Sequence, residues 1–202
     1  MTLPLQQIGQ ALVLNDAASD TSIESLEHTL GCTLPSDYKD FLKFTNGAEG
    51  WIGDEYFILW PIEEVMRLNN AYRVETFAPG LLLIGSNGGG EAFAFDMRYR
   101  PAPIVKVPFV GMDLSLVILL AESFEACLMS WLVQPTSPAE PQQHRPTNRE
   151  RLDKELFDIK PIILGGDPTD PTNKMVLTRS QHIEYVNYWN NLIRDLRTKH
   201  ST

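Results

Sequence analysis

The spacing of apolar residues along the chain predicts helices that alternate with short strands. In the segment "TSIESLEHTLG", Ile23 and Leu26 fall on one face of a helix. Thr21 and Glu24 have the spacing of a capping box, and Gly31 can adopt the left-handed conformation that ends a helix. The segment therefore predicts a first helix over residues 21–31.

A second helix is predicted directly afterwards, in "LPSDYKDFLKFTNG". Pro35 suits the first helical position, Tyr38 and Phe41 share one face, and Asn46-Gly47 ends the element. The two helices are expected to form a pair.

The middle of the chain predicts strands with further helices between them. "EAFAFD" alternates strictly, with Phe93 and Phe95 on one face and Ala92 and Ala94 on the other, as a pleated strand requires. A helix is expected to begin at Pro61, and another over "SFEACLMSWLV" with Ser123 as its cap. Three further apolar runs predict strands: "EYFILW", "GLLLIG" and "PIVKVPFV". Short connections between these elements predict an α+β fold with a meander-like antiparallel sheet and flanking helices.

A proline-rich segment divides the chain. Residues 135–147 contain four prolines and almost no apolar residues, which predicts a linker between an α+β domain (1–134) and a C-terminal extension (148–202). The extension ends in an amphipathic helix over 179–197, for which Thr178 and Gln181 have capping-box spacing. We expect its apolar stripe to dock on the first domain.

The glycine cluster in "IGSNGGGEAFAFD" raises the question of phosphate binding. Residues 84–96 lack the lysine of a Walker loop, and a strand pattern follows the glycines instead of a helix. A strand, Asn-Gly-Gly-Gly and a second strand are typical of a β-hairpin. We therefore predict a tight turn.

The net charge of the chain indicates which kinds of molecule it can bind. The net charge is −9, and residues 1–134 hold 17 Asp plus Glu against 7 Lys plus Arg. Such a field repels nucleic acid and anionic lipid and attracts a basic protein, although acidity can also serve solubility alone. The N-terminus lacks a signal-peptide pattern and the apolar runs are too short to span a membrane. A soluble, cytoplasmic protein is expected, and its oligomeric state stays open.

Motifs for catalysis or cofactor binding are weak. The four histidines have no metal-binding spacing, Cys32 and Cys127 form no CxxC, and no nucleophile motif occurs. "GGDPTDPTN" lacks the glutamate of a calcium loop and predicts a turn. We expect no cofactor, no metal site and no catalytic residue.

An acid-rich segment, "NGAEGWIGDEYF", and the helix after it form the candidate binding site. Two alternatives are a solvated acidic loop without a specific role, and paired carboxylates for acid-base catalysis. The hypothesis we favour is an exposed loop in which Trp51 anchors a protein and carboxylates meet its Lys or Arg side chains. The candidate residues are Glu49, Trp51, Asp54, Glu55, Glu63 and Glu64.

Three segments together resemble a known family. "LGCTLPSDYKDFLKFTNG", "LLLIGSNGGGEAFAFDMR" and "ESFEACLMSWL" are similar, in order and spacing, to the SUKH superfamily in its Smi/Knr-like branch, over roughly residues 20–134. The residues that match the family's pattern look like fold determinants, because they meet backbone and core needs. They are Leu30, Gly31, Leu34, Pro35, Tyr38, Asn46, Gly47, Gly85, Gly89 and Asp96.

The resemblance implies an α+β fold and a role in protein binding. Bacterial members are immunity proteins that neutralise a polymorphic toxin, contact-dependent or secreted. Fungal members act as cell-wall and signalling regulators, so an intracellular regulatory or scaffold module is the alternative. Together with the acidic first domain, the resemblance leads us to expect a non-enzymatic immunity protein whose partner is a basic toxin domain.

Overall fold

The protein is built around one antiparallel sheet. The computed structural model describes residues 12–52, 55–133 and 154–199. Within them, a 7-stranded sheet has its strands in chain order, each paired antiparallel with the next. This confirms the predicted α+β fold and its meander. The strands are β1 (Leu12–Leu14), β2 (Ala48–Ile52), β3 (Glu55–Leu59), β4 (Leu81–Ser86), β5 (Glu91–Asp96), β6 (Ile104–Pro108) and β7 (Ile118–Ala121).

Three helices pack on one face of the sheet: α2 (Asp20–Leu30), α3 (Ser36–Phe44) and α6 (Phe124–Val133). Their core is aromatic. The Tyr38 ring meets those of Phe95 and Phe124 edge-on at 5.1 Å, and all three side chains are buried. Edge-to-face contacts of this kind add to the free energy gained from burying the rings.

The helix ends differ in detail from the sequence prediction. Helix α2 is capped by Ser19, whose hydroxyl accepts from the Ser22 amide, and not by Thr21. Pro35 lies just before α3 with an extended backbone, so its fixed φ directs the chain into the helix without being part of it. Gly31 takes the left-handed conformation at the end of α2, as predicted.

Helix α4 (Ile62–Ala71) lies where the sheet opens. Strands β3 and β4 pair only at Ile58–Ser86 and Leu59–Gly85. Beyond that point the amide side chain of Asn69 replaces the missing strand, because it accepts from the Leu83 amide at 2.9 Å and donates to the Leu83 carbonyl at 2.8 Å. The short helix α5 (Val74–Phe77) then returns the chain to β4.

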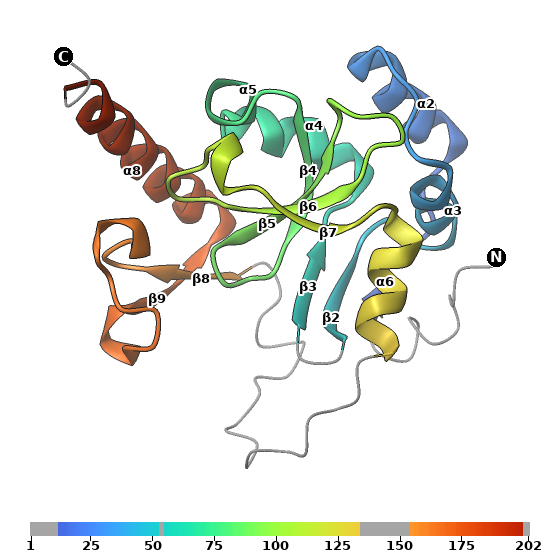
Figure 1. The fold of residues 1–202 in the computed structure, drawn as a ribbon. Coiled ribbons are helices and arrows are strands. Elements are labelled where there is room, and N and C mark those ends of the chain that lie inside the picture. Colours follow the sequence, from blue (N-terminus) through green and yellow to red (C-terminus); the bar gives the residue numbers. More distant parts are fainter. Residues whose placement is uncertain (1–11, 53–54, 134–153, 200–202) are drawn as a thin grey trace.

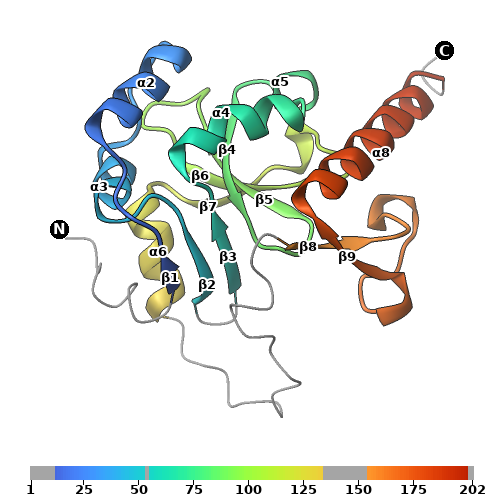
Figure 2. The same cartoon turned by 180° about the vertical axis from the view of Figure 1, so that it is seen from behind.

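The C-terminal part packs on the opposite face of the sheet. Strands β8 (Lys154–Asp158) and β9 (Lys174–Thr178) form a hairpin, and helix α8 (Arg179–Lys199) follows at once. Figures 1 and 2 show this part at the other end of the molecule from α2 and α3. The Leu156 amide donates to the Gly88 carbonyl at 2.9 Å, and Phe157, Leu177 and Val186 join one core with strands β3–β6.

Helix α8 is the amphipathic helix expected at this end of the chain. The Thr178–Gln181 capping box forms, with the Thr178 amide donating to Gln181 Oε1 at 3.1 Å. Three single turns of 3-10 helix complete the described elements: η1 (Leu114–Leu116), η2 (Ile162–Leu164) and η3 (Pro171–Asn173). The linker predicted over 135–147 lies outside the described residues.

Two hairpins lie near the candidate residues, β2–β3 and β4–β5. The glycine cluster forms the predicted turn between β4 and β5, in which Asn87 Oδ1 accepts from the Gly89 and Glu91 amides. The prediction of an exposed loop at "NGAEGWIGDEYF" is wrong, because most of it is the hairpin of β2 and β3. Glycine and acid residues made this segment look irregular, but Ala48 and Ile52 point into the core.

Candidate functional site

A hollow of about 260 Å³ lies over strands β1–β3, on the face opposite α3 and α6. Among the described residues, the C-terminal segment shares a core with strands β3–β6, and the hollow lies beside that core, with Arg179 of α8 in its lining. Side chains alternate along a strand, so Ala48 and Ile52 pack in the helix-covered core and Glu49 points to the other face, where it lines the hollow; Ala48 borders the hollow as well. We call this feature the β1–β3 hollow.

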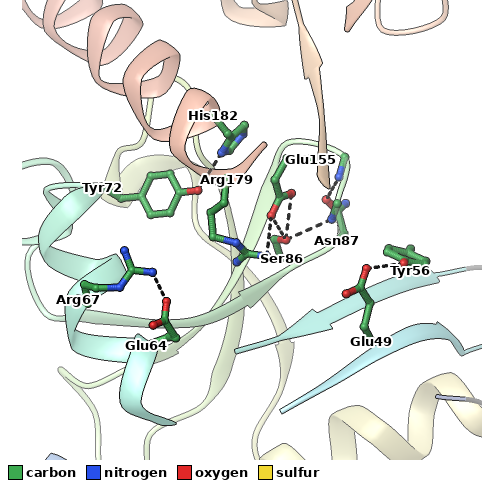
Figure 3. A network of polar contacts seen from close by, with 12 residues as sticks. Glu49, Tyr56, Glu64, Arg67, Tyr72, Ser86, Asn87, Glu155, Arg179 and His182 are labelled. Atoms are coloured by element: carbon green, nitrogen blue, oxygen red, sulfur yellow. Dashed lines mark hydrogen bonds and ion pairs between the residues drawn. The ribbon is translucent and has the colours of Figure 1, made fainter. Parts of the chain in front are cut away.

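Glu49 forms part of the floor of the hollow. Its side chain is only 8% exposed, and Tyr56 Oη donates to Glu49 Oε1 at 2.6 Å. The Trp51 ring contacts the Tyr56 ring edge-on at 5.1 Å. These contacts hold the Glu49 carboxylate in one orientation (Figure 3).

Glu64 stands on the wall that α4 contributes. Its carboxylate forms an ion pair with Arg67 one turn later, and its side chain is 39% exposed. Because the pair lies at the surface, solvent screens it and it contributes little to stability. Glu64 is therefore available to an incoming charged group.

Arg179, the first residue of α8, closes the opposite wall. Its guanidinium lies 3.7 Å from Glu155 Oε1 and stacks on the Trp60 ring at 5.6 Å. Glu155 is fully buried and accepts from the Ser86 hydroxyl at 2.9 and 3.1 Å. The buried carboxylate thus balances the arginine charge across β4, β8 and α8 (Figure 3).

Two hydrogen-bond donors of the hollow have no acceptor in the part of the chain that the structure describes. They are Trp60 Nε1 and Arg179 Nη1, and both atoms are buried. Buried donors are nearly always paired in native proteins. The hollow therefore presents the carboxylates of Glu49 and Glu64, and two residues of its lining, Trp60 and Arg179, carry these buried donors.

The candidate binding residues do not form a single cluster. Glu49 and Glu64 line the hollow and Trp51, partly buried, lies beside the Glu49–Tyr56 pair. Glu55 alternates with Tyr56 and belongs to the opposite face, where burial raises its pKa against the attraction of Lys106. Asp54 lies outside the described residues.

Glu63 lies away from the hollow, beside α2. The Asn46 side chain donates to Glu63 Oε2 at 2.7 Å, and this bond lowers the pKa of Glu63 although partial burial opposes the shift. The side chain lines a separate groove between α2 and α4.

The residues expected to determine the fold lie at chain reversals and in the core. Asn46 Oδ1 accepts from the Ile62 amide at 2.7 Å, which joins the end of α3 to the start of α4. At the end of β5, the Arg98 guanidinium binds both carboxylate oxygens of Asp96 and lowers the pKa of Asp96. Gly85 lies in β4 beside Ile58 of β3, and Gly89 lies in the following turn.

Within 12–52, 55–133 and 154–199, no three His, Cys, Asp or Glu side chains gather as metal ligands. Burial raises the pKa of the Cys127 thiol, which disfavours the reactive thiolate. In the same part of the chain, no helix combines the length and the hydropathy needed to cross a membrane.

The polar network around Glu155 was not predicted from the sequence. Ser86, Glu155 and Arg179 come from three elements far apart in the chain. One signal was present: in "KELFD" the alternation places Glu155 on the same face as the apolar Phe157. An acid on the buried face of a strand needs a partner, and its position indicated a buried pair.

Comparisons with known proteins identify relatives of this chain. A model of the SMI1 / KNR4 family (SUKH-1) matches residues 17–130, which is more than half of the chain. "Uncharacterized protein YnaB" of Bacillus subtilis (strain 168) is 38% identical over 84 residues, or 42% of this chain and 49% of that protein. The match thus spans about half the length of this relative. The family match confirms the resemblance found in the sequence, and the chain belongs to the SMI1 / KNR4 family (SUKH-1).

Proposed function

We propose that this protein is a cytoplasmic immunity protein that binds a basic toxin domain through the β1–β3 hollow and so neutralises it. The observation that carries the proposal is the hollow over β1–β3, where Glu49 and Glu64 offer two carboxylates on one side of the sheet. Family membership supports it, because the resemblance implies toxin immunity for bacterial members.

The electrostatics of the hollow favour a basic partner. Residues 1–134 carry ten more acidic than basic side chains, and such a field accelerates the approach of a positively charged protein. The positive charge of Arg179 repels a basic partner only weakly, because the carboxylate of buried Glu155 lies beside it. A lysine or arginine of the toxin would meet Glu64 at the rim and Glu49 on the floor.

The hollow is built for binding and not for a catalytic step. Glu49 already accepts a hydrogen bond from Tyr56, and Glu64 is paired with Arg67 at the surface. Neither carboxylate has the isolated, apolar setting that prepares a general acid. Neutralisation in this proposal is steric and electrostatic: the toxin surface that docks on the hollow becomes inaccessible to its own substrate.

The test begins with capture of partners by the full chain. Tagged wild-type protein, Glu64→Lys and Glu75→Lys are incubated with lysate of the parent cells, and bound proteins are identified by mass spectrometry. Glu75 is exposed on α5 and does not line the hollow, so Glu75→Lys makes the same charge change elsewhere. We expect one stoichiometric basic partner with wild type and Glu75→Lys, at least about tenfold depleted with Glu64→Lys.

The captured protein is then expressed alone. Toxicity that disappears on co-expression with wild type supports immunity. A partner without toxicity, or several substoichiometric partners, contradicts it and favours a regulatory or scaffold module. Equal capture by both lysine variants contradicts the assignment to the β1–β3 hollow.

A further inference from the structure

A second cavity lies where the C-terminal segment meets the end of the main sheet. Its volume is about 580 Å³, and it is separate from the β1–β3 hollow. The lining is mainly apolar and comes from both parts of the chain. Phe109 and Leu116 belong to the family-matched part, and Phe157, Ile162 and Ile163 belong to the C-terminal segment.

The floor of this cavity includes a fully buried histidine. His182, in the first turn of α8, has 0% exposure. Its Nδ1 lies 2.9 Å from Tyr72 Oη, the contact drawn in Figure 3. Among the described residues, His182 Nε2 has no hydrogen-bond partner. The rings of Phe109 and Phe157 stand nearly perpendicular to the imidazole, at 4.9 and 5.6 Å.

The surroundings of His182 determine whether its imidazole ring is charged. Burial, assisted by the nearby Arg179 charge, lowers the pKa of His182 to about 3, so the ring is neutral. Burial also raises the pKa of Tyr72, so the phenol keeps its proton and can donate it to Nδ1. A neutral imidazole that accepts at Nδ1 carries its hydrogen on Nε2. With the Tyr72 hydroxyl as the donor to Nδ1, His182 Nε2–H is an N–H donor of the cavity without an acceptor among the described residues.

Charged groups at the cavity are already paired. Lys174 forms an ion pair with Asp158, and Glu91 forms one with Lys106 at 2.8 Å. The cavity thus offers apolar surface and one neutral donor, without a free charge among these four side chains. Its volume falls within the range of small-molecule sites, which are concave, mostly apolar and equipped with few polar groups.

We propose that this cavity binds a neutral, mainly apolar small molecule that presents a carbonyl or hydroxyl oxygen to Nε2–H of His182. The molecule would fill the space between Phe109, Phe157 and Ile163 and would satisfy the unused donor. This site is independent of the proposed immunity function, because the toxin would dock on β1–β3.

Nile red is a suitable test compound, because it is neutral, apolar and carries a ring carbonyl. The full chain is titrated and the dye's fluorescence is followed. We expect saturation at one dye per chain. Ile163→Trp places a larger side chain in the cavity and should weaken binding at least about tenfold, whereas Val176→Trp, on exposed β9 outside the lining, should change it by less than about twofold.

The histidine is tested separately. His182→Phe keeps an aromatic ring without the donor and should weaken binding about five- to tenfold. Since that variant also leaves Tyr72 without its partner, nitrogen NMR of wild type provides a second measurement. We expect a proton on His182 Nε2, and a shift of its signal when dye is added. A proton on Nδ1, an unchanged signal at saturation, binding without saturation, or equal binding by Ile163→Trp would overturn the proposal.

Discussion

Gly47 lies between α3 and β2, at a place where the neighbouring chain leaves no room for a side chain. It has a left-handed φ of 86°, and a Cβ there would lie 2.5 Å from the Leu59 carbonyl oxygen and 2.9 Å from Pro61 N. The neighbouring Thr45 hydroxyl donates to the Gly47 carbonyl at 2.6 Å. The turn between α3 and β2 therefore packs directly on the backbone that leads from β3 into α4, too closely for a side chain at position 47.

Gly47→Ala should strongly destabilise the protein. Gly31 is the matched control, because its φ is also left-handed at 68° but nothing lies within 4 Å of an added Cβ. We expect Gly31→Ala to reduce the free energy of unfolding by about 1 kcal/mol, the cost of the left-handed conformation. Gly47→Ala should cost at least about 3 kcal/mol, because backbone overlap adds to that strain. Equal losses in urea denaturation would show that close approach at Gly47 is unimportant.

His182 should make stability depend on pH. Its pKa is about 3 in the folded protein against 6.5 for a free histidine. Between pH 3 and pH 6.5, the histidine therefore binds a proton in the unfolded chain but not in the native state. The stabilisation is complete above pH 6.5 and is lost as pH falls toward 3. Over this window the free energy of unfolding should fall by up to about 1.4 kcal/mol per pH unit.

Urea denaturation of wild type and His182→Phe at several pH values between 6.5 and 4 measures this effect. Other groups titrate in both proteins, so the difference between the two curves isolates His182. The stability advantage of wild type should shrink as the solution becomes more acidic. Parallel curves would contradict a buried, neutral His182.

Helix α8 is attached to the main sheet by side-chain hydrogen bonds as well as by apolar contacts. Asn190, 2% exposed, accepts from the Gly111 amide at 2.6 Å and donates to the Phe109 carbonyl at 2.9 Å. Arg197 near the helix end binds Asp113 at 2.7 Å. The side-chain amide of Asn190 thus binds backbone groups of the loop after β6 and links this loop to helix α8.

Asn190→Ala should loosen this attachment. The substitution leaves the Gly111 amide and the Phe109 carbonyl buried without partners, and we expect a loss of about 3 kcal/mol in the free energy of unfolding. Asn191→Ala is the control, because Asn191 accepts from Arg73 nearer the surface and should cost at most about 1 kcal/mol. Hydrogen exchange should show faster exchange in α8 for Asn190→Ala alone. Similar losses in both variants would refute the role of Asn190.

Helices and strands whose apolar residues recur at regular spacing could be predicted from the sequence. Elements that depend on contacts with other parts of the fold could not. The face of α3 with Tyr38 and Phe41, and the alternation of Phe93 and Phe95 in β5, follow from local patterns. Strand β7 was not predicted, because its apolar run has no alternation and its side chains are partly exposed at the sheet edge. Strand β2 was predicted as a loop because it contains the acidic residue Glu49. The strand can bury this carboxylate because the Tyr56 hydroxyl donates a hydrogen bond to it.

The site was only partly predictable for the same reason. Sequence placed Glu49 and Glu64 among the candidates by composition, but the face that each residue occupies depends on strand register. Glu55 was grouped with them and lies on the other side of the sheet. The pairing of Ser86 with Glu155 joins residues 69 positions apart, and no local spacing encodes it.

For the molecule as a whole, charge should control association with the partner. Residues 1–134 are strongly acidic, so affinity for a basic partner should fall as salt rises from about 0.05 to 0.5 M and the charges are screened. Glu64→Lys should reduce both the affinity and its dependence on salt. Titration calorimetry with the captured partner measures both quantities. Affinity independent of salt would exclude electrostatic attraction.

Growth of cells that express the captured partner tests immunity through the β1–β3 hollow. The partner is induced together with wild type, Glu64→Lys or Glu75→Lys, and the protein levels are matched by immunoblot. We expect wild type and Glu75→Lys to restore growth, and Glu64→Lys to fail. Growth restored equally by all three would contradict a role for the hollow, and growth restored by none would contradict immunity itself.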